Sequence, residues 1–136
     1  MNDVCPKKVE ISIPSELGYE KAVLAAVIEL AQKIGFSSER IDDLKTVLSE
    51  AVINAIEHGN QLKVELGVQT IACLETNGLI LKVVDQAQCP LPALPALRSE
   101  QAGHRGWGLL LIQNLVDEVK AITTPGRNEL HMVFYR

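Results

Sequence analysis

The chain has 136 residues, of which 47% are hydrophobic and 22% are charged, and its formal net charge is -4 at pH 7. This length suits one domain, so we expect residues 1–136 to fold as a single unit, and the composition argues against a disordered chain. Without a block of Lys and Arg, the sequence predicts no basic surface for nucleic acid or an anionic membrane. A protein or small-molecule partner is favoured instead.

The sequence also carries information on the cellular compartment. The N-terminus shows no signal segment, and the apolar run at residues 22–30 is too short to span a bilayer. The three cysteines, Cys5, Cys73 and Cys89, form neither an even set nor a C-x-x-C pair. We therefore expect reduced, structural cysteines in a cytoplasmic protein.

The first half of the chain predicts one strand and two helices. Residues 8–13 alternate polar and apolar side chains up to Pro14, which is typical of a strand, and this strand is a candidate sheet edge. Residues 19–34 then favour a helix that stops at Gly35. A second helix is expected over residues 41–56, with Ser37 or Ser38 as its N-cap.

The second half predicts hairpins around one further helix. Strands at 63–74 and 79–84 are expected to pair across Thr76-Asn77-Gly78. Loss of periodicity and three prolines predict a lid at 86–105. The remaining expected elements are a helix at 109–118, opened by Gly106-Trp-Gly108, and strands at 119–123 and 129–135 around a turn at 125–128. This order predicts an α+β fold, a two-layer sandwich whose mixed, mainly antiparallel sheet carries helices on one face.

One side of the second predicted helix carries polar groups at regular spacing. Glu50, Asn54 and His58 follow one another at steps of four, so a regular α-helix would align them opposite its apolar stripe. Asn costs roughly 0.5 kcal/mol relative to Ala within a helix, which indicates a role beyond propensity. The alternative is a solvated face that ends at a C-cap formed by Gly59.

Two further positions are candidates for ligand contacts. Asp85 closes the predicted strand 79–84, where its carboxylate would face the space above the sheet, or would only cap a turn. Gly106-Trp-Gly108 precedes a predicted helix, so its backbone amides could approach a phosphate that Arg105 would pair with directly. The alternative for this segment is an ordinary loop-to-helix turn.

Taken together, these motifs and their order resemble the GHKL ATPase superfamily, named for gyrase, a heat-shock chaperone, histidine kinases and a mismatch-repair protein. The resemblance rests on the Glu50 to Gly59 helix, on Asp85, and on His104-Arg-Gly-Trp-Gly-Leu109 after a long lid. Within that superfamily, residues 106–119 look most like the bacterial anti-sigma-factor serine/threonine kinases. The resemblance implies the Bergerat-type ATP-binding fold over nearly the whole chain.

The resemblance also implies a role for each matching residue. Glu50 matches the general base that acts on an attacking hydroxyl, and Asn54 matches the ligand of the Mg²⁺ that bridges the phosphates of ATP or ADP. Asp85 matches the aspartate that accepts a hydrogen bond from the adenine amino group. The other implied nucleotide-site residues are His58, Gly59, Ala87, Arg105, Gly106, Trp107, Gly108 and Leu109.

The chain departs from the family pattern at four positions. Ala87 and Cys89 stand where relatives commonly have glycine, and a positive φ at Ala87 would cost roughly 1 kcal/mol. Trp107 replaces a smaller aliphatic residue, and His104 stands where many relatives have glycine. The changes at Trp107 and His104 remove no proposed catalytic group.

The leading interpretation is a Mg-ATP-dependent protein serine/threonine kinase that binds a sigma factor and phosphorylates an antagonist protein. The alternative, motivated by Ala87 and Cys89, is a binding switch on the same fold without phosphoryl transfer, with or without nucleotide. A detached histidine-kinase domain is disfavoured because no dimerisation helix with a phosphoacceptor His precedes it. The sequence lacks G-x-x-x-x-G-K-[ST] and a His-Arg-Asp loop, which excludes P-loop and eukaryotic-type kinase chemistry. The edge strand at 8–13 leaves a homodimer open.

Overall fold

The computed structural model describes residues 5, 7–94 and 103–136, with the backbone only at 103–107. The lid predicted at 86–105 therefore lies in part outside the described residues. The elements in chain order are β1 (Lys8–Pro14), α1 (Glu20–Lys33), α2 (Ser38–Asn54), the π-helix η1 (Ala55–Gly59), β2 (Gly67–Glu75), β3 (Gly78–Asp85), α3 (Gly103–Leu115), β4 (Glu118–Thr124) and β5 (Arg127–Tyr135).

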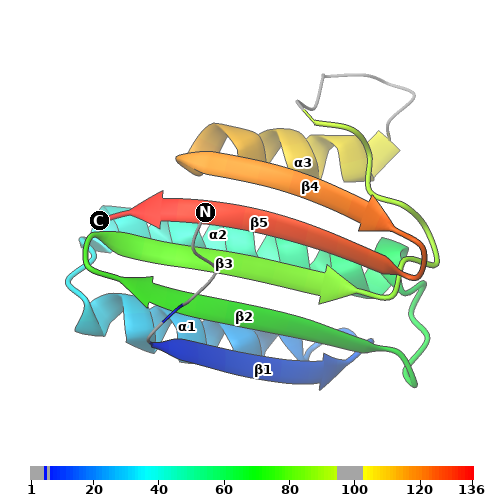
Figure 1. The fold of residues 1–136 in the computed structure, drawn as a ribbon, viewed down its shortest axis with the longest axis horizontal. Helices are drawn as coiled ribbons and strands as arrows, with labels where there is room; N and C mark the ends of the chain where they lie inside the picture. The colour runs from blue at the N-terminus through cyan, green and yellow to red at the C-terminus, as the bar shows by residue number, and fades with distance from the viewer. Residues whose placement is uncertain (1–4, 6, 95–102) are drawn as a thin grey trace.

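The five strands form one sheet in the order β1-β2-β3-β5-β4. Each neighbouring pair among these strands is antiparallel, and β1 is an edge as predicted. The three helices lie behind the sheet in Figure 1, so the predicted α+β two-layer architecture is confirmed. The core lies between the layers, where alternate side chains of β3 and β5, such as Leu81 and Met132, are fully buried under α1 and α2.

Local signals explain the first two helices well. Gly35 has a φ of +91°, a left-handed conformation that ends α1, as predicted. The Ser37 hydroxyl accepts a hydrogen bond from the backbone N–H of Arg40 at 3.1 Å, which makes Ser37 rather than Ser38 the N-cap of α2. Both helices thus begin and end close to the positions that the sequence predicts.

Three predicted elements have wrong boundaries. Strand β2 begins at Gly67 and not at residue 63, because Gln61 and Leu62 have positive φ and the chain is still turning there. Helix α3 begins at Gly103, before the Gly106-Trp-Gly108 segment, and ends at Leu115. Strand β5 already begins at Arg127, so the turn before it contains only residues 125 and 126.

Arg40 connects the start of α2 to the far end of the sheet and to α3. Its guanidinium donates to the carbonyl oxygens of Leu115 and Tyr135, each at 3.0 Å, and it pairs with Asp117. The guanidinium also lies 5.0 Å from the centre of the Phe134 ring. These contacts hold the C-terminal end of α3 against α2, so the two helices run alongside each other toward the candidate site.

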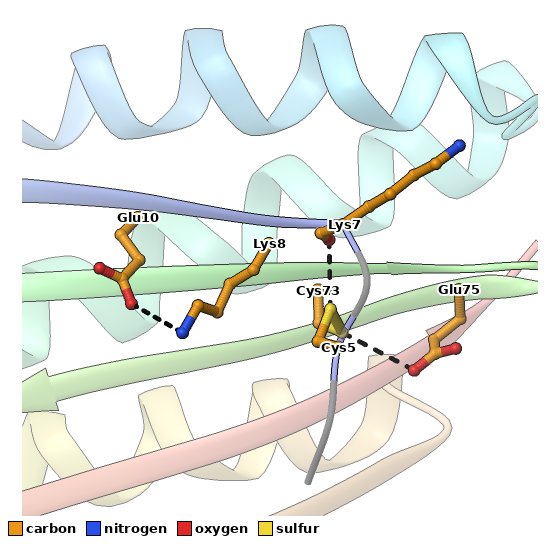
Figure 2. The surroundings of a disulfide bond; sticks show 6 residues. All are labelled: Cys5, Lys7, Lys8, Glu10, Cys73 and Glu75. Atoms are coloured by element: carbon orange, nitrogen blue, oxygen red, sulfur yellow. Dashed lines mark hydrogen bonds and ion pairs between the residues drawn. A yellow bond between two sulfur atoms is a disulfide. The ribbon is translucent and has the colours of Figure 1, made fainter.

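The cysteine prediction is wrong in one respect. Figure 2 shows that Cys5 and Cys73 form a disulfide, with 5.9 Å between their Cα atoms. Cys89 takes no part in a disulfide with the other described residues. The pairing depends on strand register, because β1 and β2 place Lys8 opposite Cys73 and so bring the preceding residues over that position. Spacing along the sequence does not reveal this neighbourhood, since 68 positions separate the two cysteines.

Candidate functional site

Helices α2 and α3 bring the first group of candidate residues together. A Cβ atom built on Gly108 would lie 2.7 Å from Glu50 Oε2 and 3.0 Å from Asn54 Nδ2. The backbone of α3 therefore passes directly over the two polar side chains, and a larger residue at position 108 would displace the Glu50 carboxylate. The structure thus joins Glu50, Asn54 and Gly108, which lie up to 58 positions apart in the sequence.

Asn54 is buried and carries an unpaired side-chain amide, which are features of a ligand-binding residue. Its side chain is only 5% exposed, and Nδ2 finds no hydrogen-bond partner within the described part of the chain. A buried unpaired amide costs about 1–3 kcal/mol, so a partner outside the protein would relieve a real penalty. Because the two ends of an amide are assigned from their contacts, this group could offer either nitrogen to a phosphate or oxygen to a cation.

The donor set fits Mg²⁺ bound with a nucleotide. Mg²⁺ prefers hard oxygen ligands and usually takes only one or two from the protein, with the rest from water and phosphate. The Asn54 amide oxygen is such a ligand, and the neighbouring Glu50 carboxylate, half-buried, adds negative charge. The residues present are therefore compatible with Mg²⁺, and the role of Asn54 as its ligand, which the family resemblance implies, stays a prediction.

His58 does not continue the line of Glu50 and Asn54. Residues Ala55–Gly59 form a π-helix, in which the N–H of Asn60 bonds to the carbonyl of Ala55 at 2.8 Å. The wider turn rotates the following residues away from the regular four-residue spacing, so the predicted alignment holds only for Glu50 and Asn54. Single π turns of this kind occur frequently at functional sites.

Gly59 makes room for Asp85, and the interpretation as a C-cap is wrong. Its φ is not in the left-handed region, whereas a Cβ atom built on it would lie 2.0 Å from Asp85 Oδ2 and 2.3 Å from Asp85 Cγ. A side chain at this position would overlap the carboxylate. The structure thus brings the end of the α2–η1 helix and the end of β3 into direct contact.

The Asp85 carboxylate is held in place by two donors. It is 4% exposed, and Oδ1 accepts hydrogen bonds at 2.8 Å from the backbone N–H of Ala87 and from Asn128 Nδ2. Ala87 reaches this position with a φ of +50°, so the cost of a positive φ considered from the sequence applies here. The carboxylate therefore has a defined orientation at the end of the sheet.

Two buried asparagines near the site were missed by the sequence interpretation. Asn60 is fully buried, and it accepts from the N–H of Gln86 at 2.7 Å and donates to Ser15 and Gly67. Asn128 is 1% exposed and contacts Asp85. A signal for Asn128 exists, because it stands at the start of the inward-facing alternation that continues with Leu130 and Met132.

The other predicted site residues lie on α3. The Leu109 side chain is buried in the core, so only its backbone could face a ligand. The side chains of Arg105 and Trp107 lie outside the described part of the structure. Because α3 begins at Gly103, the free N–H groups of its first turn belong to residues 103–105, and Gly108 lies within the helix. Phosphate binding by this segment stays a prediction.

A separate hollow of about 480 Å³ opens where β2, β3 and β5 meet the turn before β5. Its lining includes Asp85, Gln69 and Arg127 but neither Glu50 nor Asn54. It therefore adjoins the Asp85 end of the site without containing the Glu50 end.

Among the described residues, no helix is both long enough and apolar enough to cross a membrane.

Comparison with known proteins gives consistent results. The histidine kinase-like ATPase domain family matches residues 13–134. Serine-protein kinase RsbW of Bacillus velezensis is 30% identical over 130 residues, covering 87% of this chain and 79% of the relative. The anti-sigma F factor of a Thermoanaerobacter species is 30% identical over 129 residues, covering 90% and 88%.

The fold is also found among solved structures. The RsbU and RsbW domains of a Mycobacterium tuberculosis protein superpose with a TM-score of 0.72 at 22% identity, over 95% of this chain and 32% of that longer chain. A histidine kinase domain from Erythrobacter litoralis superposes with a TM-score of 0.55 at 15% identity, over 90% and 61%. These likenesses concern the fold alone. By its sequence, the chain belongs to the histidine kinase-like ATPase domain family, together with serine-protein kinase RsbW and the anti-sigma F factors.

Proposed function

We propose that this protein is an anti-sigma regulatory factor that acts as a Mg-ATP-dependent protein serine/threonine kinase. It would bind a sigma factor and phosphorylate an anti-sigma-factor antagonist. The names of the relatives support this proposal. The observation that supports it is the close approach of Gly108 to the Glu50 carboxylate and to the Asn54 amide, whose Nδ2 is unpaired among the described residues; these are the residues proposed as base and as Mg²⁺ ligand.

Each residue has a distinct task in the proposed reaction. Glu50 accepts the proton of the attacking serine or threonine hydroxyl, because an ionised carboxylate is an acceptor only. Asn54 holds Mg²⁺ through its amide oxygen, and Mg²⁺ when bound neutralises charge on the phosphates. Asp85 accepts a hydrogen bond from the adenine amino group. Gly59 leaves space for the Asp85 carboxylate, and the N–H of Ala87 donates to Asp85 Oδ1 and so orients it.

The proposed partners have consequences for assembly and location. A sigma factor and its regulators act in the cytoplasm, where reducing conditions would oppose the bond between Cys5 and Cys73. Residues 1–136 would act as one domain, and the exposed edge of β1 offers a surface for a homodimer. Sedimentation at several protein concentrations tests the dimer.

A binding switch without phosphoryl transfer is the second candidate. The observation that favours it is the left-handed backbone of Ala87, since a non-glycine residue in this strained conformation follows Asp85, where the family pattern commonly has glycine. Such a protein would bind its sigma factor without phosphorylating an antagonist.

The decisive experiment follows labelled γ-phosphate from Mg-ATP to candidate antagonists encoded in the same genome, beside a pull-down with sigma factors. Glu50→Gln keeps the shape of the side chain and should abolish transfer while nucleotide binding persists. Asn54→Ala should weaken Mg-ATP binding itself. Glu39→Gln, an exposed position on the same helix, is the matched control and should transfer normally.

Two results would contradict the proposal. Sigma binding by the wild type without transfer to any antagonist would favour the switch. Undiminished transfer by Glu50→Gln would remove Glu50 from the role of general base.

A further inference from the structure

Asn128 is the centre of a hydrogen-bond network that links three strands to the segment after β3. It stands opposite Asp85 on β3 and opposite Thr123 on β4, at the end of the sheet where the candidate site lies. Its side chain is almost completely buried, with 1% exposure. A polar side chain at this depth needs partners, and the partners of Asn128 define what it does.

Both ends of the Asn128 amide are used fully. Nδ2 donates to Asp85 Oδ1 and to the carbonyl oxygen of Cys89, each at 2.8 Å. Oδ1 accepts from the Thr123 hydroxyl at 2.9 Å and from the N–H of Leu91 at 3.3 Å. Four bonds exhaust the two hydrogens and two lone pairs of the amide. The arrangement also settles its orientation, because the nitrogen faces two acceptors and the oxygen faces two donors.

We infer that Asn128 is a positioning residue for base recognition: it orients the Asp85 carboxylate and fixes the first residues after β3 beside it. This inference rests on the proposed function, in which Asp85 reads the adenine amino group. Asn128 itself need not touch the nucleotide. Its effect would appear as discrimination between purines with and without a 6-amino group.

The chemistry of the network explains why an amide stands at this position. An aspartate of the same shape would place a second carboxylate against Asp85 and against the Cys89 carbonyl, with no hydrogen to donate. A leucine would fill the volume but leave the Cys89 carbonyl and the Thr123 hydroxyl without their present partner. Only a side chain that donates and accepts at once holds the carboxylate and the loop together.

The test measures affinity for Mg-ATP and for its analogue that carries hydrogen in place of the 6-amino group. The wild type should bind ATP about tenfold more tightly, as expected for one hydrogen bond to a charged group. Asn128→Ala should reduce this preference to within about twofold. Thr123→Val, which removes only one bond to the Asn128 oxygen, should reduce it partly. The control is Glu129→Gln, on the adjacent residue and the opposite face of β5.

Different results would overturn the positioning role of Asn128 and the proposed function. If the wild-type protein binds neither nucleotide, or binds both equally, then Asp85 does not recognise the adenine amino group, and the inference fails with it. A different result overturns only the positioning role: the wild-type protein prefers ATP, but Asn128→Ala loses affinity for both nucleotides in the same proportion. A purely structural residue would have this effect. If circular dichroism shows that Asn128→Ala does not fold, Thr123→Val decides: an unchanged preference overturns the inference.

Discussion

Gly59→Ala is expected to destabilise the protein although alanine is the better helix former. A methyl group at this position would lie 2.0 Å from Asp85 Oδ2 and 2.7 Å from Asp85 Oδ1, closer than any allowed contact. Asp85 would have to rotate away, and its bonds to Asn128 and to the N–H of Ala87 would be lost. The backbone adds no cost, since the φ of Gly59 is not left-handed.

The magnitude follows from the bonds at risk. A hydrogen bond to a charged group contributes about 1.5–3 kcal/mol, so losing two would cost about 3–6 kcal/mol. The helical preference of alanine over glycine offsets about 1 kcal/mol of this. We therefore expect the free energy of unfolding to fall by about 2–5 kcal/mol, measured by guanidinium denaturation with circular dichroism.

Two further variants test whether the clash with Asp85 causes the loss of stability. Gly67→Ala is the matched control, because its nearest neighbour would lie 3.7 Å away, and it should change stability by no more than about 0.5 kcal/mol. In an Asp85→Ala background the obstruction is gone, so Gly59→Ala should become neutral or slightly stabilising. An equal cost in both backgrounds would refute the steric explanation.

Three other predictions test the surroundings of the site and the sheet. Ala87→Gly should raise the free energy of unfolding by up to about 1 kcal/mol, because glycine adopts the φ of +50° without strain; a loss in denaturation experiments would argue against strain there. In protein purified without reductant, mass spectrometry should find Cys5 linked to Cys73, and Cys73→Ser should lower stability by about 2–4 kcal/mol; identical stability with and without reductant would contradict this. Arg127 is the main cause that holds the pKa of Glu129 below its ordinary value of 4.5, so the unfolded chain takes up the proton more readily. The stabilisation is then complete above about pH 4.5 and is lost as pH falls through the folded pKa, and Glu129→Gln should show a shallower loss of stability in acid.

Local chemistry explains where sequence interpretation succeeded. The stop of α1 at Gly35 and the Ser37 cap of α2 depend on residues within a few positions, and so they are visible in the sequence. The same holds for the hairpin of β2 and β3, whose turn is two residues long. The start of α3 at Gly103 was missed because His104 and Arg105 are as compatible with a loop as with a helix, so the sequence left the boundary undetermined.

Contacts between distant segments explain where it failed. The interpretation of Gly59 as a helix C-cap, one of two alternatives for this residue, is wrong because Asp85, 26 positions later, occupies the space above it, which nothing nearby in the sequence reveals. The sequence places Asn128 in a turn. Its role is not visible there, because its partners lie on two other strands and on the segment after β3. The bond between Cys5 and Cys73 likewise depends on the register of β1 and β2.

The sequence by itself determined the α+β class, most of the helices and strands, and the identity of Glu50, Asn54 and Asp85 as candidate residues, because periodicity, caps and motif spacing are properties of short segments. Only the tertiary structure decided which of these residues meet. It placed Gly108 over Glu50 and Asn54, and Gly59 against Asp85, through packing of elements that are far apart along the chain. A glycine shows in sequence that a side chain is absent, but the atom that needs the space appears only when the chain has folded.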